Sequence, residues 1–575
     1  MKKYIFCLLF LFTIIHQIYS QKIVHAEILG RPTDKSIVVQ AFFDVPTEVC
    51  VQYGTVSGQY TAQTAWKSVP AQEQAEVLVE GLKANTNYFY RLCYRKTGTT
   101  TVLNRPEHSF TTQRALGSKF SFVVQADPHL DEQSDSALYR LCLKNQLADA
   151  PDFMVDLGDF LMSDKLKNAA GKLTHDTVIY RSHLMRSYYE TSCHSVPLFI
   201  ALGNHEGEAG WQLNGTSENV AIWGAVERKK YFVNPYPDNF YTGDATLNAI
   251  VGQRGNYYAW NWGDALFIVL DPYWYTNTKP DANNGWRWTL GKTQYDWLKT
   301  TLEKSTATYK FVFAHQLIGG DPDGRGGVEF ANFYEWGGKN RDGSDGFAAN
   351  RPGWYKPIKD VLTENKVSIF FHGHDHFFGK QEKDCLIYQE TPQPSHPNFV
   401  STTYATDYGY KEGQILPNSG YIRVTVDGKN DLKVEYVRAY LPKNEASNRK
   451  NKDVSATYYL NNANCYTLQK PLASEPTMLW NSNYSDELVC PNPFQTTTEV
   501  RFTVAIPERL SLTILNEKGQ LVKDVLSNNW VEAGQYQVVW DGKNNQGVEQ
   551  PSGVYFYVIE GQSKERKSGK ILLNR

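Results

Sequence analysis

The sequence has few residues of the kinds that mark a thiol-based or a strongly charged protein. Its 575 residues include 8 cysteines and 5 methionines, and no two cysteines stand in a CxxC spacing. Lysine and arginine (59) nearly balance aspartate and glutamate (61), which leaves a formal net charge of -2. The missing CxxC pairs argue against a cysteine zinc site. The even charge gives no electrostatic basis for binding nucleic acid or an anionic membrane.

Long apolar runs are also missing, except at the start of the chain. Lys2 and Lys3 precede an apolar stretch over 5–15, and Ser20 supplies a small residue at its end. This pattern predicts an export signal peptide over residues 1–20 and is too short for a spanning helix. No later run approaches the length needed to cross a bilayer. We therefore expect no transmembrane segment in the mature chain, and a secreted or cell-surface location.

Export bears on the interpretation of the cysteines. Removing Cys7 with the signal peptide leaves an odd number, which implies no disulfide framework. Cys50 and Cys93 could pair with each other, because an exported domain can keep a disulfide. Buried free thiols are the alternative, since cysteine is among the residues most often buried.

Residues 21–115 contain short runs that alternate between apolar and polar residues, with turn residues between them. Such alternation predicts a small antiparallel β-sandwich. Within it, the stretch LKANTNYFYR over 82–91 resembles the corner signature of fibronectin type III domains. We interpret residues 21–115 as a domain of that kind.

Over residues 118–445 strand patterns alternate with helical ones, which favours a layered α/β core. Helices are predicted over 134–147 and 294–302. Two strands over 421–426 and 432–437, split by an Asp-Gly turn, close this domain as a hairpin.

The remaining chain divides into a polar stretch and an all-β unit. Residues 446–482 have weak periodicity and are predicted to be a linker, whereas 483–575 read as short strands. The landmarks of this last unit are Pro491-Asn492-Pro493-Phe494, Gly519, Ala533-Gly534, Trp540-Asp541-Gly542 and Ser552-Gly553-Val554-Tyr555. Their order resembles the C-terminal type A sorting domain of the bacterial type IX secretion pathway. The resemblance implies transfer across the outer membrane by that secretion machinery; an ordinary Ig-like binding module is the alternative.

Six short apolar runs in the central region each end close to a residue that can bind metal. The runs and the residues that follow them are 122–124 with Asp127 and His129, 153–155 with Asp159, 198–200 with Asn204 and His205, 267–269 with Asp271, 311–313 with His315, and 368–370 with His374 and His376. Runs of this length predict buried strands, and ligands gather beyond the carboxyl ends of strands in open α/β sheets. Five of the six runs therefore bring Asp, Asn and His side chains to one rim, which predicts a site for two metal ions.

Each motif alone has an ordinary structural explanation. A lone Asp159 could be a solvated turn residue, and a lone His315 could be a core histidine. All of the motifs together, each after an apolar run, are hard to explain by chance. A carboxylate can bridge two ions, which makes Asp159 the candidate bridge, while His205 would stand beside the metals and contact the substrate. Asp271 is expected to be structural.

The ordered set Asp-x-His, Gly-Asp, Gly-Asn-His-Glu, a lone His and Gly-His-x-His resembles the calcineurin-like metallophosphoesterase superfamily. With a fibronectin-like domain in front, the arrangement is similar to purple acid phosphatases. The resemblance implies an α/β fold: an αββα sandwich core flanked by an N-terminal and a C-terminal β-sandwich. The roles that it implies are Asp127, His129 and His376 on one metal, Asn204, His315 and His374 on the other, Asp159 as the bridge, and His205 as the catalytic residue that binds no metal.

The chain departs from the purple enzymes at two positions. Met162 stands where those enzymes have a tyrosinate ligand, and His129 has no counterpart in their first motif. We therefore expect no charge-transfer colour. All of the ligands are nitrogen or oxygen atoms, which leaves zinc, manganese and iron open as the two divalent ions.

These features together predict a secreted dinuclear-metal phosphoesterase. It would hydrolyse phosphate monoesters by in-line attack of a metal-bridging hydroxide. Its substrate is expected to be a small-molecule phosphate ester in contact with Asn204, His205 and His396, although His396 could equally be a polar loop residue. The alternatives are a phosphodiesterase on nucleotides or glycerophospho-compounds, and a surface binding protein without catalysis. Loss of a ligand would favour the last of these, and every expected ligand is present.

Aromatic residues crowd the long connections near the presumed rim. Examples are Trp211, Trp223, Trp286, Trp288 and Trp354. They could stack a ring of the substrate, but we favour the interpretation that they cover the core and bury the loops.

Overall fold

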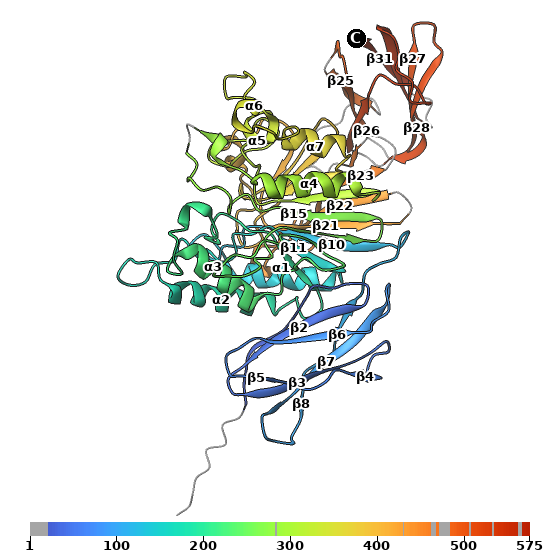
Figure 1. Ribbon diagram of the computed structural model, residues 1–575. Helices are drawn as coiled ribbons and strands as arrows, with labels where there is room; N and C mark the ends of the chain where they lie inside the picture. The colour runs from blue at the N-terminus through green and yellow to red at the C-terminus, as the bar shows by residue number, and fades with distance from the viewer. Residues whose placement is uncertain are drawn as a thin grey trace, which may run out of the picture.

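The computed structural model describes residues 21–281, 284–428, 431–461, 467–470, 484–490, 492–504, 508–531, 534–561 and 566–575. The predicted signal peptide lies outside the described residues, as do 462–466 and 471–482 of the predicted linker. Figure 1 shows N-terminal strands in blue, a mixed core and C-terminal strands in red. In the part of the chain that is described, no helix has the length and hydropathy needed to cross a bilayer.

The N-terminal strands form two antiparallel sheets around one apolar core. The first sheet contains β1 (Ile23–Gly30), β2 (Ser36–Phe43) and β6 (Ala75–Glu80). The second contains β3 (Thr47–Gly54), β4 (Ala62–Gln63), β5 (Lys67–Val69), β7 (Asn87–Lys96), β8 (Leu103–Asn104) and β9 (His108–Thr111). Alternate residues of β6 and β3, among them Val77 and Val49, lie in the same buried cluster. The period-2 pattern thus forms the sandwich that it predicted.

Two larger sheets form the core of the central region. The first sheet has the order β12-β11-β10-β21-β22-β23-β24 and the second the order β13-β14-β15-β16-β17-β19-β18-β20. The strands of the first are β10 (Phe120–Gln125), β11 (Phe153–Asp156), β12 (Leu198–Ile200), β21 (Gly420–Val426), β22 (Asp431–Arg438), β23 (Val454–Asn461) and β24 (Thr467–Lys470). Those of the second are β13 (Thr242–Gly243), β14 (Tyr258–Trp262), β15 (Ala265–Val269), β16 (Tyr309–Phe313), β17 (Ile369–His372), β18 (Phe378–Lys383), β19 (Leu386–Glu390) and β20 (Gln414–Leu416).

The inner faces of these two sheets pack on each other through aromatic rings. Phe267 of β15 lies with its ring centroid 5.1 Å from that of Phe122 on β10, in an edge-to-face arrangement. Phe153 of β11 contacts the same Phe267 ring at 5.1 Å. Rings of this kind contribute both buried area and a preferred geometry. They hold the two sheets face to face.

Helices cover the outer face of each sheet. On the first sheet these are α1 (Ser136–Ala148), α2 (His175–Tyr189) and α3 (Val220–Tyr231); on the second they are α4 (Lys292–Lys304) and α7 (Ile358–Glu364). The short helices are α5 (Tyr334–Gly337), α6 (Phe347–Asn350), α8 (Thr403–Asp407), η1 (Gly210–Gln212), η2 (Gly285–Arg287) and η3 (Pro442–Asn444). Leu298 and Leu302 of α4 bury against Ile268 and Phe370 of the second sheet. The order of layers is therefore helix, sheet, sheet, helix.

All six predicted apolar runs are strands, but they divide between the two sheets. β10, β11 and β12 are parallel neighbours in the first sheet, and β15, β16 and β17 are parallel neighbours in the second. Each set directs its carboxyl ends to one edge of its own sheet. The packing of the sheets brings those two edges together, so the single rim that was predicted is built from both.

The end of the central region corrects one prediction. The hairpin of β21 and β22 is present, but residues 454–461 of the predicted linker form β23, which pairs with β22. Ala456 and Tyr458 of this strand are buried in the core between the sheets. Their alternate spacing is a strand signal that the surrounding polar residues obscured.

The C-terminal strands form two further sheets around a separate apolar core. One contains β25 (Tyr484–Cys490), β26 (Thr498–Val504) and β29 (Gly534–Trp540), and the other β27 (Glu508–Asn516), β28 (Leu521–Val531), β30 (Gly553–Gly561) and β31 (Arg566–Leu573). Phe494, Trp540 and Tyr555 pack together inside it. These were landmarks of the sequence pattern, and here they fill the core.

Four of the cysteines in the described part of the chain follow the alternative of buried thiols. Cys50 on β3 lies directly opposite Cys93 on β7. Both are buried and free, as are Cys142 and Cys193. Cys385 is disulfide-bonded, which the odd cysteine count did not predict.

Candidate metal centre

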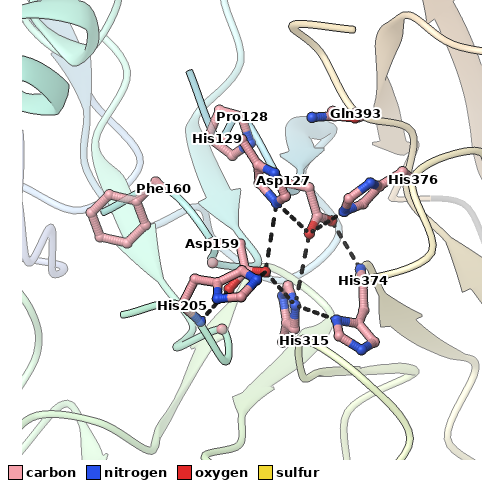
Figure 2. Close-up of polar contacts among 12 residues, drawn as sticks. Asp127, Pro128, His129, Asp159, Phe160, His205, His315, His374, His376 and Gln393 are labelled. Carbon is pink, nitrogen blue, oxygen red and sulfur yellow. Dashed lines mark hydrogen bonds and ion pairs between the residues drawn. The ribbon is translucent and has the colours of Figure 1, made fainter. Parts of the chain in front are cut away.

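The strand ends continue into turns of unusual backbone conformation. Asp127, His129, Asp159, His374 and His376 all have positive φ, between 45° and 78°. Positive φ is uncommon in residues other than glycine, costs about 1–3 kcal/mol each, and clusters at functional sites. The turns direct these side chains from both sheets into one place, which Figure 2 shows.

One group of side chains consists of Asp127, His129 and His376. Nε2 of His376 lies 3.3 Å from Oδ1 of Asp127, and Nε2 of His129 lies 3.5 Å from the same oxygen. One atom from each residue lies within 4.8 Å of the others, close enough to share a metal ion. This is the first predicted ligand set.

A second group consists of Asp159, His315 and His374, also with its atoms within 4.8 Å. Nε2 of His315 is 3.2 Å from Oδ2 of Asp159 and 3.1 Å from Nδ1 of His374. The other nitrogen of His315, Nδ1, is 2.9 Å from the carbonyl oxygen of Leu157. A proton on Nδ1 would make that hydrogen bond and leave the lone pair of Nε2 for a metal.

Asp159 belongs to the second group and also faces the first. Its Oδ2 atom is 3.2 Å from His315 of one group and 3.6 Å from His129 of the other. A carboxylate in this position can reach an ion in each group, and the bridging role stays a prediction from the sequence. The two groups are therefore one contiguous site.

Several buried acceptor atoms at this site have no hydrogen-bond partner among the described residues. They are Oδ1 of Asp127, Nε2 of His129, Oδ1 of Asn204 and Nε2 of His374. A buried polar atom without a partner costs about 1–3 kcal/mol. Cations would satisfy these atoms, so the residues present fit a pair of metal ions with oxygen and nitrogen ligands.

The charges of the site also favour cations. Burial alone would raise the pKa of Asp127, yet the imidazoles of His315 and His376 hold it well below its usual value. Burial opposes protonation of His315, but Asp159 and Asp127 raise the pKa of that imidazole to about 9. Burial, Arg325 and His315 together hold the pKa of His374 well below its usual value. The two buried carboxylates thus hold a positive charge on His315, which a metal ion would replace, while His374 is neutral, the form that binds metal.

The sequence of the chain matches two protein-family models. Residues 120–378 match the calcineurin-like phosphoesterase family, and residues 492–565 match the FlgD Ig-like domain. The chain carries a calcineurin-like phosphoesterase domain. It is a metal-dependent phosphoric ester hydrolase, and the predicted fold class is confirmed.

Solved structures provide two further comparisons with the chain. The structure of PhoD has 15% sequence identity, covers 79% of this chain and 92% of its own, and superposes with a TM-score of 0.56. The purple acid phosphatase PPD1 from yellow lupin (Lupinus luteus) seeds has 14% identity, covers 76% of this chain and 74% of its own, and gives a TM-score of 0.49. The likeness to PhoD shows a shared fold. No curated protein matches the chain by sequence.

His205 of the phosphoesterase domain stands beside the two groups, where the sequence placed it. Its Nε2 atom is 4.0 Å from Oδ2 of Asp159, and its Nδ1 atom is 2.9 Å from Oδ1 of Asp164. Asp164 therefore fixes the orientation of the imidazole and leaves Nε2 toward the centre. Sequence reasoning missed Asp164, which belongs to no motif.

Glu206 holds the turns that carry Asp159 and Asn204. Its buried carboxylate accepts hydrogen bonds from the backbone N–H groups of Asp159 at 2.9 Å, Phe160 at 2.9 Å and Leu161 at 3.0 Å. Burial and the charge of Asp159 raise the pKa of Glu206 to about 7. The Gly-Asn-His-Glu motif contained this residue, but nothing in the sequence indicated its role.

Arg181 of α2 connects the two turns that follow β10 and β11. Its Nε donates to the carbonyl of Leu161 at 2.6 Å, and Nη2 donates to that of Phe160 at 3.0 Å. The same guanidinium donates to the carbonyl of His129, and to that of Leu130 at 3.4 Å. One buried side chain thus ties the backbone around His129 to the backbone just after Asp159. No sequence signal pointed to it.

The other predicted residues lie around this centre. His396 is half-buried, and its Nδ1 accepts a hydrogen bond from the backbone N–H of Asn398 at 3.1 Å. Burial lowers the pKa of this imidazole. The carboxylate of Asp271 accepts hydrogen bonds from the side-chain amide of Asn256 and from the backbone N–H of Tyr273, so Asp271 is structural as expected. Met162 is buried.

Most of the aromatic residues belong to the core, as favoured from the sequence. Trp288 and Trp336 are buried in the cluster over the second sheet, and Trp211 and Trp354 pack against it. Trp223 stacks on His175 with ring centroids 5.7 Å apart. They cover the phosphoesterase domain and bury its long loops.

A cavity of about 490 Å³ opens beside the centre. Its lining residues are His129, His205, His376, Arg181, Leu130, Asp131, Glu132, Gln133, Met162, Lys165 and Leu166. The three histidines form the side next to the ligand groups, and the turns after β10 and β11 form the rest together with Arg181 of α2. Two of the three are predicted metal ligands and the third is the predicted catalytic residue, so the cavity is the natural place for a substrate.

Proposed function

We propose that this protein hydrolyses small phosphate monoesters with two divalent metal ions. One ion would be held by Asp127, His129 and His376, and the other by Asn204, His315 and His374. Asp159 would bridge the two ions. When bound, such ions lower the pKa of water and neutralise phosphate oxygens. The observation that carries the proposal is the position of His205, which lies beside Asp159 but outside both ligand groups.

The residues of the chain supply orientation and proton transfer. Burial lowers the pKa of His205, but the carboxylates of Asp159 and Asp164 outweigh this effect and raise it. His205 can therefore carry a proton at Nε2 and donate it to the leaving oxygen of the substrate, a role typically worth about 10²–10⁴ in rate. Asn204 and His396 are proposed to contact the substrate as well. The cavity of about 490 Å³ beside the centre is proposed to take the leaving group of the substrate.

Metal analysis coupled to a substrate panel tests this proposal. The full chain, loaded separately with zinc, manganese or iron, is assayed on phenyl phosphate, glycerol 2-phosphate and bis(4-nitrophenyl) phosphate. We expect two metal ions per chain and faster hydrolysis of the monoesters. His175→Gln is a suitable control, because His175 is paired with Glu227 outside the centre. A preference for the diester would replace the monoester assignment, and failure to cleave any ester with two metals bound would favour a binding protein.

We also propose that the chain is exported and crosses the outer membrane by the type IX pathway. The basic and apolar pattern of residues 1–20 supports export, and the order of landmarks in 483–575 supports a sorting domain, with a fibronectin III-like domain at 21–115. The match of 492–565 to an Ig-like domain is compatible with this assignment. Expression with and without residues 483–575 in a bacterium that has the pathway provides the test. The full chain should reach the medium or cell surface, and the truncated chain should stay in the periplasm.

A further inference from the structure

One wall of the cavity beside the metal centre is formed by residues that have no role in the proposed hydrolysis. Beyond the three histidines, this wall is formed by 130–133 after β10 and by Met162, Lys165 and Leu166 after β11. Leu130, Met162 and Leu166 give it an apolar part. Such a surface suits the carbon skeleton of a leaving group, since apolar walls with a few polar groups are typical of ligand sites.

Two of the four charged residues in the lining are already committed. Arg181 donates to the backbone carbonyls of both turns. Asp131 lies 3.2 Å from Nδ1 of His129 and also accepts hydrogen bonds from the backbone N–H of Gln133 and the hydroxyl of Ser134, both at 3.0 Å. Neither side chain is free to bind a substrate.

The other two charged residues, Lys165 and Glu132, are exposed and lie on opposite turns. Among the described residues, neither has an ion pair or a side-chain hydrogen bond. Lys165 directly follows Asp164, the residue that orients His205. Lys165 is thus the uncommitted cation on the His205 side of the cavity, where the leaving oxygen would take its proton.

We propose that Lys165 determines specificity by binding a second anionic group, a carboxylate or a phosphate, on the leaving group of the substrate. This inference rests on the proposed function and names its substrate class: phosphate monoesters of small anionic alcohols or phenols. The ammonium group is a compact charge on a flexible stem, so it can reach an anion at the cavity mouth without a fixed geometry. The apolar residues Leu130, Met162 and Leu166 would contact the carbon atoms between the two anions.

Calorimetry with a matched pair of inert ligands tests this inference. Phenylphosphonate and 4-carboxyphenylphosphonate differ by one carboxylate, and neither can be hydrolysed. We expect the metal-loaded full chain to bind the carboxylated ligand about fivefold more tightly, the size of a single partly exposed ion pair. Lys165→Ala should remove this preference and leave the dissociation constant of phenylphosphonate unchanged, whereas Lys165→Arg should retain it.

A neighbouring lysine provides the control. Lys167 is exposed on the same loop but is not part of the cavity lining, so Lys167→Ala should behave as the parent. Equal weakening of both ligands by Lys165→Ala would place Lys165 on the reacting phosphate and overturn the proposal. Equal binding of the two ligands by the parent would overturn it too. Because the ligands are inert, binding and hydrolysis are tested separately. If the protein cleaved no ester but still preferred the carboxylated ligand through Lys165, the proposed function would be rejected and the role of Lys165 in anion binding would stand.

Discussion

Oδ1 of Asp164 lies 2.9 Å from Nδ1 of His205, and this contact sets which imidazole nitrogen faces the metal centre. A carboxylate on Nδ1 holds the tautomer and the orientation of a histidine. The contact therefore connects the turn after β11 with the histidine after β12, and it carries the first prediction.

Asp164→Asn should lower kcat by about tenfold to a hundredfold, within the range typical of general acid catalysis. The asparagine keeps the shape of the side chain but removes the negative charge that raises the pKa of His205, so the imidazole would hold less readily the proton that it donates. Metal content and KM should change little, because Asp164 belongs to neither ligand group. Steady-state kinetics together with metal analysis provides the measurement. A loss of metal that accompanied the loss of rate would contradict this role.

A second prediction separates the proposed bridge, Asp159, from the proposed proton donor, His205. Asp159→Ala should lose both metal and activity, because Oδ2 of Asp159 lies close to histidines of both ligand groups. His205→Ala should retain two metals and lose turnover by about 10²–10⁴. Metal stoichiometry after dialysis and the rate on phenyl phosphate distinguish the two variants. Full activity in either one would reject the assignment.

Arg181 provides a third prediction. Arg181→Lys keeps the charge but replaces a planar fork with a single ammonium group. The lysine cannot donate hydrogen bonds to the carbonyls of His129, Phe160 and Leu161 together. The turns with positive φ should then lose their conformation. We expect metal affinity to fall by about 10–100-fold, as for other residues that orient metal ligands.

Competition with a chelator measures this affinity. The matched control is Arg140→Lys on α1, where the guanidinium lies over the ring of Tyr188 at 4.0 Å. Its metal affinity should equal that of the parent. If Arg181→Lys bound metal as tightly as the parent, the turns would have to be held by other contacts.

The parts of the site that could be predicted from the sequence are those in which a ligand directly follows its own strand. Asp127, Asp159, His315 and His374 are of this kind, because an apolar run and the residue after it form one local pattern. The two-sheet packing came only from the family resemblance, since the periodicity of a buried strand does not say which sheet it joins. β23 was missed because Ala456 and Tyr458 alternate within a polar stretch.

The residues that hold the ligands in place could not be predicted. The contacts of Arg181, Asp164 and Glu206 join residues that are far apart in the sequence. Arg181 and Leu130, for example, are 51 residues apart. The positive φ angles of Asp127 and His376 could not be predicted from the sequence either, because the surrounding structure imposes them and the residue type does not. These contacts depend on the assembled fold.

The last prediction concerns the interface between the N-terminal sandwich and the phosphoesterase domain. His194, just before β12, stacks on His108 of β9 with ring centroids 4.0 Å apart. Burial and the charge of His108 lower the pKa of His194 to about 4. Glu27 lies 3.1 Å from Nε2 of His108 and 2.9 Å from Nε of Arg105. In an unfolded chain the pKa of a histidine is about 6.5.

The sign of the pH effect follows from this difference. As the pH falls below about 6.5, the unfolded chain takes up the proton at this histidine before the folded chain does, so the folded state loses stability progressively until about pH 4. His194→Gln should make the melting temperature less dependent on pH in this window, while leaving it nearly unchanged at pH 8. Thermal unfolding followed by circular dichroism at pH 4.5, 5.5, 6.5 and 8 measures the difference between variant and parent. Metal release in acid affects both proteins alike, so a parallel decline in the two would show that His194 does not contribute.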